Sequence, residues 1–331
     1  MAHTTRSLAV GLLALAVAGC SASAQESVDP AAQTEGTTYP LTVDNCGEEV
    51  VFESAPERVV LLESAPVTIL DGLGVLDRAV ARAGTFSDEY YSADLNRRID
   101  QVEMLSDEID TAGHLMINAE VVLAQQPDLT LGLPEGLTRE GLHDGGSNTL
   151  VQPVYCPSDV GDTSFASLYE QIGTYGEVFD RRDEAEDLVA DLRARVAAAE
   201  EATAADTPER DAAVLYPSVG GGPLYAYGRG SMAQPQLGAA GFTNVFDDTA
   251  ERVFEVSVEE LIARDPDVLV LLYQGDESGV LEAVEGLPGS DALQAIENDD
   301  VLVQLFNFTE PPTPLSVDGL ERIVERFGTG S

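Results

Sequence analysis

The sequence predicts an α/β fold: two Rossmann-like lobes with mostly parallel sheets, joined by one long α-helix, with a ligand cleft between them. The leading observation is an internal echo, because residues 119–131 (AEVVLAQQPDLTL) resemble residues 258–270 (VEELIARDPDVLV), 139 positions later. In each copy a Glu opens an amphipathic run, and a Pro-Asp pair follows, where proline cannot continue a helix. The apolar run that comes next fits a strand covered on both faces, as in a parallel sheet. Chance similarity of two helix–loop–strand junctions is the alternative explanation.

The second observation is a long helical stretch between the two copies. Residues 165–202 carry apolar side chains at helical spacing, then an Arg/Glu/Ala-rich run, and no interior proline. We therefore expect an N-terminal lobe over residues 39–163, a connecting helix over residues 164–203 and a C-terminal lobe over residues 204–331.

Apolar runs, prolines and glycines predict the order of elements inside each lobe. In the N-terminal lobe we expect a strand or hairpin at 39–51, a strand at 58–62, a short helix at 67–73, a strand at 79–83, the echoed helix and strand at 115–124 and 128–132, and a strand at 149–155. In the C-terminal lobe we expect a strand at 211–216, a glycine-rich loop at 220–222, a helix at 232–241, the echoed pair, a late strand at 301–308 and a closing helix at 315–327.

The N-terminus is typical of an exported protein. Arg6 precedes an apolar run, residues 8–18, which is too short for a stable membrane span and leads through small residues into Cys20. The arrangement resembles a bacterial lipobox and predicts a signal peptide over residues 1–19, with lipid attached to Cys20. Residues 20–38 are poor in large apolar side chains and predict a disordered tether. We expect the protein at the extracytoplasmic face of the cell membrane, lipid-anchored at Cys20 and in contact with the membrane through this anchor only. Secretion without lipid is the alternative.

The composition is acidic and excludes several chemistries. The chain has 59 Asp and Glu against 17 Lys and Arg, and none of the 17 is a lysine. Loss of residues 1–19 removes Arg6 and no acidic residue, which takes the net charge from −42 to −43. Such a chain should repel nucleic acid and anionic membranes. A salty habitat, in which a carboxylate-rich surface stays hydrated, would explain the balance, and so would a codon bias favouring Arg over Lys together with a generic acidic surface. Without lysine there is no P-loop, Schiff-base or kinase lysine, and G-x-S-x-G is absent, so no enzyme is predicted.

Few residues are available for disulfide or metal chemistry. If Cys20 carries lipid, Cys46 and Cys156 are left over, and an oxidising exterior favours pairing between them. With no His nearby, these two thiols make a poor zinc site. His114 and His143 each stand alone in a polar stretch, so a transition-metal site is not predicted.

Several strings, taken in order, resemble the ferric-siderophore substrate-binding lipoproteins of ABC importers, especially actinobacterial ones. They are TVDNCGEEVVF at 42–52, APERVV at 55–60, LDGLG at 70–74 and GFTNVF at 241–246. Together with the echoed segments, the resemblance covers nearly the whole chain after residue 38. It implies two lobes joined by one helix, a ligand held between them, and a Cys46–Cys156 disulfide inside the first lobe.

The resemblance also implies partners. The ligand would be a ferric siderophore whose chelator keeps the iron wrapped, so neither a cofactor nor a direct protein ligand to the metal is expected. The receiving partner would be an ABC permease with its ATPase, for which a monomer suffices. The chain departs from the family at Thr68 and near Pro235, where many relatives carry glutamates that dock onto the permease. Glu63, Asp71 and Asp247 are the substitutes that the sequence offers.

The expected ligand site lies beyond the carboxyl ends of the strands. The residues there share this position at strand ends, and many are aromatic, which suits a bulky chelate. They are Glu63, Ser64, Gly84, Thr85, Phe86, Pro134, Tyr225, Tyr227, Arg229, Tyr273, Gln274, Phe306 and Phe308. On an extended strand Phe306 and Phe308 would face the same side, as would Tyr225 and Tyr227. The alternatives are ordinary packing of these rings within a lobe and a surface ion pair for Arg229.

The sequence therefore predicts a solute-binding lipoprotein that captures a ferric siderophore and delivers it to an ABC permease for iron uptake. A hydroxamate is favoured, because a chain near −43 has no evident way to attract a strongly anionic tricatecholate complex. The same fold carrying cobalamin or haem is one alternative, with Tyr225, Tyr227 or Tyr273 as an axial haem ligand. A surface protein or hydrolase without a transport role is the other.

Overall fold

The computed structural model describes residues 36–109, 115–156, 162–203 and 210–328. The predicted signal peptide and Cys20 lie outside these residues, as does His114. In the described part of the chain, no helix is long and apolar enough to span a bilayer.

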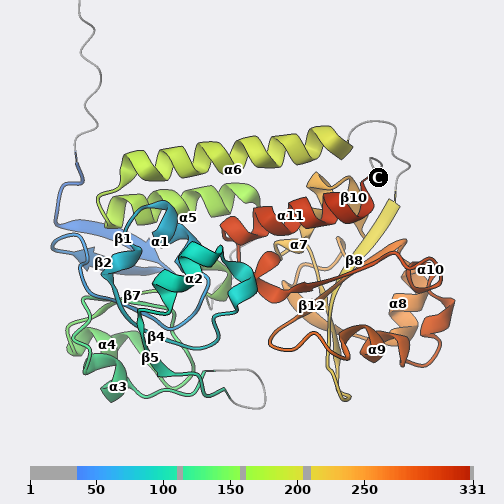
Figure 1. Ribbon diagram of the computed structural model, residues 1–331, viewed down its shortest axis with the longest axis horizontal. Coiled ribbons are helices and arrows are strands. Elements are labelled where there is room, and N and C mark those ends of the chain that lie inside the picture. Colours follow the sequence, from blue (N-terminus) through green and yellow to red (C-terminus); the bar gives the residue numbers. More distant parts are fainter. Residues whose placement is uncertain (1–35, 110–114, 157–161, 204–209, 329–331) are drawn as a thin grey trace, which may run out of the picture. The chain divides into compact units, whose positions relative to one another are not determined.

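The N-terminal lobe is built on a parallel sheet, which among the described residues has five strands in the order β5-β4-β3-β6-β7 (Figure 1). These strands are β3 (Val59–Leu61), β4 (Ala79–Ala83), β5 (Glu103–Ser106), β6 (Leu129–Leu131) and β7 (Asn148–Leu150). The helices are α1 (Val67–Gly72), α2 (Ala93–Ile99), α3 (Ala119–Leu123) and α4 (Arg139–Asp144). Every residue of β3 and β6 is buried, as expected of central strands in a parallel sheet.

An antiparallel hairpin precedes this sheet, formed by β1 (Leu41–Asn45) and β2 (Glu48–Phe52). Its turn has Cys46 and Gly47 at positive φ, 63° and 78°. Cys46 is bonded to Cys156, which follows the 3₁₀ helix η3 (Pro153–Tyr155). The structure thus confirms the predicted disulfide, and it lies within the N-terminal lobe.

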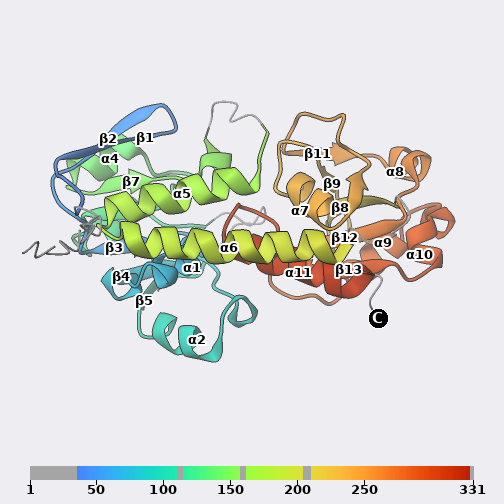
Figure 2. The ribbon, with the colours of Figure 1, turned by 90° about the horizontal axis from the view of Figure 1, so that it is seen from above.

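The stretch predicted as one helix contains two helices, and the longer of them, α6, joins the lobes. α5 (Phe165–Val178) ends before residues 179–181, and α6 (Arg182–Thr203) follows. The chain turns because the Arg181 N–H donates to the Gly176 carbonyl at 2.7 Å and Asp180 takes a φ of 55°. α6 packs against α1 of the first lobe and against α7 and α11 of the second, and Figure 2 shows it running past both. The predicted single helix over 165–202 is therefore wrong at its middle.

The C-terminal lobe contains a mixed sheet, with strands in the order β11-β9-β8-β12-β13 and β10 paired to β8 within the described residues. The strands are β8 (Arg210–Pro217), β9 (Leu224–Tyr227), β10 (Phe242–Asn244), β11 (Val253–Val256), β12 (Val268–Tyr273) and β13 (Val301–Leu305). The helices are α7 (Ala233–Ala239), α8 (Val258–Arg264), α9 (Val280–Glu285), α10 (Gln294–Glu297) and α11 (Pro314–Phe327). β8, β10, β12 and β13 run parallel, whereas β9 and β11 pair antiparallel.

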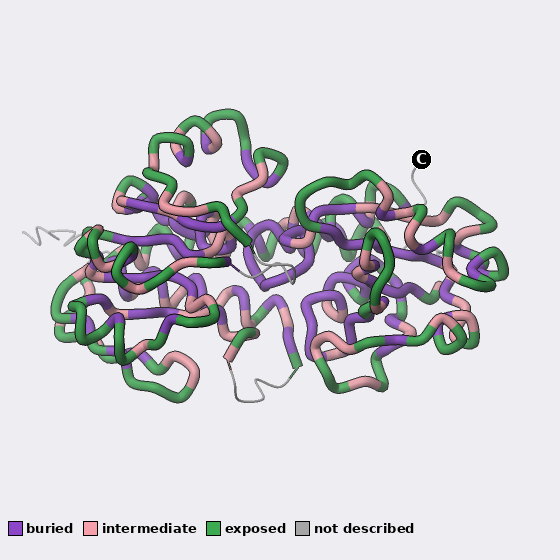
Figure 3. The backbone as a smooth tube through the Cα atoms, turned by 90° about the horizontal axis from the view of Figure 1, so that it is seen from below, coloured by how far each residue is buried: buried purple, intermediate pink, exposed green. Residues whose placement is uncertain are grey.

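The two-lobed α/β fold is confirmed. The echoed segments form α3 with β6 in one lobe and α8 with β12 in the other, so the internal similarity is structural. Buried residues run through the sheets of both lobes and exposed ones occupy the outer loops, as Figure 3 shows.

Two predicted strands are shorter than expected. The strand expected over 149–155 ends at Leu150, and Pro153 then opens η3. The strand expected over 301–308 ends at Leu305 and becomes the 3₁₀ helix η5 (Phe306–Phe308), because the Phe306 carbonyl accepts from the N–H groups of Thr309 and Glu310.

Candidate ligand-binding cavity

A cavity of 1010 Å³ lies between the lobes. The first lobe supplies the segments that follow β3, β4 and β6, namely residues 62–65, 84–85 and 132–135. The second lobe supplies residues 274–275 after β12, together with Phe306, Asn307 and Pro311. Parallel strands place their carboxyl ends at one edge of a sheet, which explains why these segments meet.

Direct contacts join the lobes beside the cavity. The side-chain amide of Asn307 donates to the Ser64 hydroxyl at 2.9 Å, and its backbone N–H donates to the Tyr90 hydroxyl at 3.0 Å. The Thr163 hydroxyl donates to the Gly230 carbonyl at 2.7 Å. The Asn307–Ser64 bond holds η5 against the segment that follows β3, so Asn307 helps to set the width of the cavity.

Glu63 places an acidic group in the cavity wall directly after β3. Burial raises the pKa of Glu63 to about 7, and a hydrogen bond from the Gln152 side chain opposes part of the rise. Across the cavity wall, burial raises the pKa of Tyr155 well above its ordinary value, and the charges of Glu63 and Glu310 add to it. In the part of the chain that the structure describes, no cation pairs with Glu63.

A second buried acid, Glu310, lies one residue before Pro311. Its side chain is 0% exposed, and its carboxylate accepts from the Met232 N–H at 2.6 Å and lies 3.4 Å from Arg252. Burial raises the pKa of Glu310 to about 7, against the opposing effects of Arg252 and the Met232 N–H. The Arg252 guanidinium also lies over the Tyr155 ring, 5.3 Å from its centroid, and so connects the two lobes.

The described residues form no metal centre. Within the described residues, no three His, Cys, Asp or Glu side chains come together in a way that could hold a metal ion.

Residues 59–304 match the periplasmic binding protein family. The chain belongs to that family. Among solved structures, this periplasmic binding protein is similar to an ABC-type Fe³⁺-hydroxamate transport protein from Saccharomonospora viridis, with 60% identity and a TM-score of 0.84 over 88% of this chain and 100% of the other. Comparison with curated proteins gave no match.

More distant structures share the fold. A periplasmic binding protein from Veillonella parvula has 20% identity and a TM-score of 0.71, covering 87% of this chain and 97% of its own. A periplasmic haem-binding protein from Pseudomonas aeruginosa has 21% identity and a TM-score of 0.66, covering 83% of this chain and 94% of its own.

Seven of the predicted site residues of this periplasmic binding protein line the cavity. They follow β3, β4, β6, β12 and β13, and are Glu63, Ser64, Gly84, Thr85, Pro134, Gln274 and Phe306. Each stands within a few residues of a strand end, where the sequence placed it.

Phe86, Phe308 and Tyr273 do not line the cavity. Phe86 packs against the core, with the Arg82 guanidinium 5.1 Å from its ring centroid. Phe308 is 3% exposed and contacts the Tyr90 ring, since η5 turns it away from Phe306 instead of keeping both on one strand face. Tyr273 is 6% exposed, because β12 is buried along its whole length.

The three predicted residues of and after β9 also lie outside the cavity lining. Tyr227 is 3% exposed and its carbonyl accepts from the Asn244 side chain at 3.1 Å. Tyr225 is 36% exposed on the same strand. Arg229 pairs with Asp162 at 3.2 Å, which makes it a surface ion pair between the lobes.

Sequence reasoning missed several lining residues. Tyr155 falls in the strand predicted over 149–155, although Pro153 two positions earlier is a signal for a turn. Asn307 lies between the two predicted phenylalanines and was overlooked because it is not aromatic. Arg139 comes from α4, whose contribution depends on tertiary packing that no local pattern reveals.

Proposed function

We propose that this protein captures a ferric hydroxamate siderophore in the 1010 Å³ cavity and delivers it to an ABC permease for iron uptake. The observation that carries the proposal is the cavity between the lobes, considered with the 60% identity to a protein of an Fe³⁺-hydroxamate transport system that this chain covers in full. A cavity of this size suits a bulky chelate.

The proposed ligand contacts are the seven predicted residues that line the cavity, together with Asn307 and Tyr155. Glu63, Ser64 and Asn307 supply polar groups, whereas Phe306 and Tyr155 supply rings that can pack on the organic shell of a chelate. The chelator would keep all of the bonds to iron, so the protein needs no metal ligand or cofactor of its own.

The proposal extends to the setting of the protein in the cell. Residues 1–19 would be removed, Cys20 would carry lipid, and residues 20–38 would tether a monomer to the outer face of the cell membrane. The N-terminal lobe over 39–163 and the C-terminal lobe over 204–331 would present the loaded cavity to a permease driven by its ATPase. The protein would act by binding and transfer, not as an enzyme.

Haem is less well suited to this cavity. None of the three tyrosines predicted as axial haem ligands, Tyr225, Tyr227 and Tyr273, lines the cavity. Tyr155 does, but the pKa of its hydroxyl is raised well above the ordinary value by burial and nearby carboxylates, which disfavours the phenolate that would bind ferric iron.

Intrinsic fluorescence provides the test. The chain has ten Tyr and no Trp, so tyrosine emission of the purified protein reports ligand binding. We expect quenching by a ferric trihydroxamate at sub-micromolar concentration, and weak or no response to a ferric tricatecholate, cobalamin or haem. A response only to haem or cobalamin would replace the ligand and keep the fold. If none of these ligands quenches the tyrosine fluorescence of folded protein, the proposed transport function is overturned.

A further inference from the structure

The charged groups that line the cavity are mostly acidic. Among the described lining residues there are four carboxylates, Glu48, Glu63, Glu135 and Glu140, and one cation, Arg139. Because the Debye length is about 8 Å at physiological ionic strength, these local charges act on a bound ligand more strongly than the distant surface does.

Arg139 is not available to an anionic ligand. Its guanidinium donates to the Thr149 carbonyl at 2.6 Å and to the Asn45 side chain, and it lies 3.8 Å from Glu48. Only 15% of its side chain is exposed. The one cation of the described lining is therefore committed to holding α4 against the hairpin and β7.

Glu63, in contrast to Arg139, has no oppositely charged partner among the described residues. Its side chain packs over Gly132, where φ is +96° and an added Cβ would lie 3.2 Å from the Glu63 Cγ. The ionisable groups that interact with Glu63 are Tyr155 from η3 and Tyr175 from α5, and both hydroxyls are neutral at physiological pH because burial raises the pKa of each. A carboxylate in such surroundings is costly unless a cation accompanies it.

We infer that the cavity selects a ferric hydroxamate that carries a protonated amine, and that the Glu63 carboxylate is the counterion of this amine. The inference rests on the proposed function, since it names the charge class of the same ligand. A hydrogen-bonded ammonium–carboxylate pair is among the stronger polar contacts that proteins make. A neutral hydroxamate would leave the Glu63 carboxylate with the Gln152 hydrogen bond but without a cation, and an anionic chelate would meet four carboxylates with no available cation among the described lining residues.

The protonation of Glu63 provides a second test of the inference. Its pKa is raised to about 7 without ligand, so part of the population is neutral at neutral pH. A bound ammonium favours the carboxylate and would lower this pKa. Affinity for an amine-bearing chelate should therefore rise from pH 6 to pH 8, whereas affinity for its neutral analogue should not. An alkyl ammonium with a pKa near that of lysine, about 10.4, stays charged across this range.

A matched ligand pair tests the inference. Ferrioxamine B is a ferric trihydroxamate with one free ammonium, and its N-acetyl derivative has the same iron centre without that charge. Both are titrated into wild type, Glu63→Gln and Glu259→Gln. The last variant removes one carboxylate from an exposed position on α8 outside the cavity, so it matches the change in net charge. Far-UV circular dichroism checks that each variant is folded.

We expect wild type and Glu259→Gln to bind the ammonium form about tenfold more tightly than the acetylated form, and Glu63→Gln to lose this preference. Equal affinity of wild type for both ligands would overturn the inference and leave the proposed function standing. A preference that survives in Glu63→Gln would overturn the assignment to Glu63. Failure of wild type to bind either hydroxamate would overturn the proposed function itself. If Glu63→Gln does not fold, the affinity of wild type for the ammonium form is measured between pH 6 and pH 8 instead. An affinity that does not change over this range would overturn the inference.

Discussion

Asp128 and Asp267 make equivalent hydrogen bonds to the backbone in the two lobes. The Asp128 carboxylate accepts from the N–H groups of Glu57 and Arg58, at 2.8 and 2.9 Å, just before β3. The Asp267 carboxylate accepts from the Asp211 N–H at 3.0 Å, near the start of β8. Each aspartate thus ties the loop before its own strand to the neighbouring parallel strand.

This relationship predicts that Asp128→Asn destabilises the protein. The amide can keep one acceptor but turns a donor toward the second backbone N–H, so we expect a loss of about 1–3 kcal/mol in the free energy of unfolding. Urea unfolding followed by circular dichroism measures it. Asp77→Asn, an exposed position, is the control and should change stability by less than about 0.5 kcal/mol. Equal effects of the two variants would contradict the role of Asp128.

The echo also explains how far the sequence could predict the fold. The signals that repeat are local: Glu120 and Glu259 near the helix starts, the Pro-Asp pairs and the apolar runs. They repeat because each lobe contains the same helix–loop–strand unit. The break at residues 179–181 could not be predicted in this way. It depends on Gly176 lying against Ala185, where an added Cβ would be only 2.5 Å from the Ala185 Cβ, a tertiary contact.

The residues of the candidate site also divide into those that local sequence signals predict and those that depend on tertiary packing. Residues directly after strands, such as Glu63, Thr85 and Gln274, were predictable because strand ends are local and parallel sheets align them. Tyr227 and Phe308 were not, since the side on which a ring is buried depends on what covers it. Aromatic character suggested a ligand contact where the structure has ordinary core packing.

A double-mutant cycle between Asn307 and Ser64 tests the bond that joins the lobes beside the cavity. We expect each of Asn307→Ala and Ser64→Ala to weaken ferric trihydroxamate binding about three- to tenfold, because the bond holds η5 against the end of β3. The double variant should lose little more than either single one, with a coupling energy of about 1 kcal/mol. Titration by tyrosine quenching measures all four proteins. Strictly additive losses would show that the bond does not position the cavity wall.

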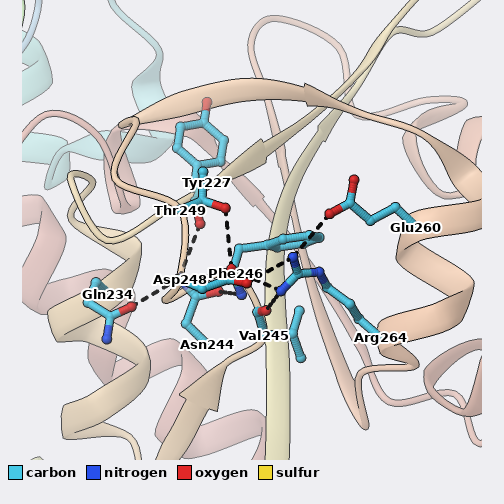
Figure 4. Close-up of polar contacts among 9 residues, drawn as sticks. All are labelled: Tyr227, Gln234, Asn244, Val245, Phe246, Asp248, Thr249, Glu260 and Arg264. Carbon is cyan, nitrogen blue, oxygen red and sulfur yellow. Dashed lines mark hydrogen bonds and ion pairs between the residues drawn. The ribbon is translucent and has the colours of Figure 1, made fainter.

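Arg264 is expected to hold the loop after β10 in place. Figure 4 shows its guanidinium against the Phe246 ring, 4.7 Å from the centroid, with hydrogen bonds to the Val245 carbonyl, to both oxygens of Asp248 and to Glu260. Arg264→Lys keeps the charge but cannot form the forked contact with Asp248. We expect it to cost about 1–2 kcal/mol of unfolding free energy, measured by urea unfolding.

Glu260→Gln is the matched comparison for Arg264. It removes only the exposed partner on the same helix, 3.0 Å from the guanidinium, and should cost no more than about 0.5 kcal/mol. A loss as large as that of Arg264→Lys would mean that the ion pair, and not the contacts with Val245, Phe246 and Asp248, fixes this loop.

The disulfide should contribute strongly to stability. Cys46 and Cys156 are 110 residues apart, and a closed loop of that length is worth about 4–5 kcal/mol on the chain-entropy model. We expect the Cys46→Ser, Cys156→Ser double variant to unfold at much lower urea concentration than wild type. Wild type treated with a reductant should match the double variant, and a difference between them would point to the serine substitutions instead of the lost bond.

Glu310 should make the protein less stable as pH rises. Its pKa is raised from the ordinary 4.5 to about 7 in the folded state, so the folded protein holds this proton more tightly than the unfolded chain. The resulting stability is fully present below pH 4.5 and is lost as pH rises through about 7, a change on the order of 3 kcal/mol. Glu310→Gln keeps an acceptor for the Met232 N–H and cannot ionise, so its stability should fall less between pH 5 and pH 8. Other carboxylates also titrate in this range. The informative quantity is therefore the slope of unfolding free energy against pH, compared between Glu310→Gln and Glu259→Gln. Urea unfolding at each pH measures it. Equal slopes would mean that Glu310 stays ionised next to Arg252 throughout this range.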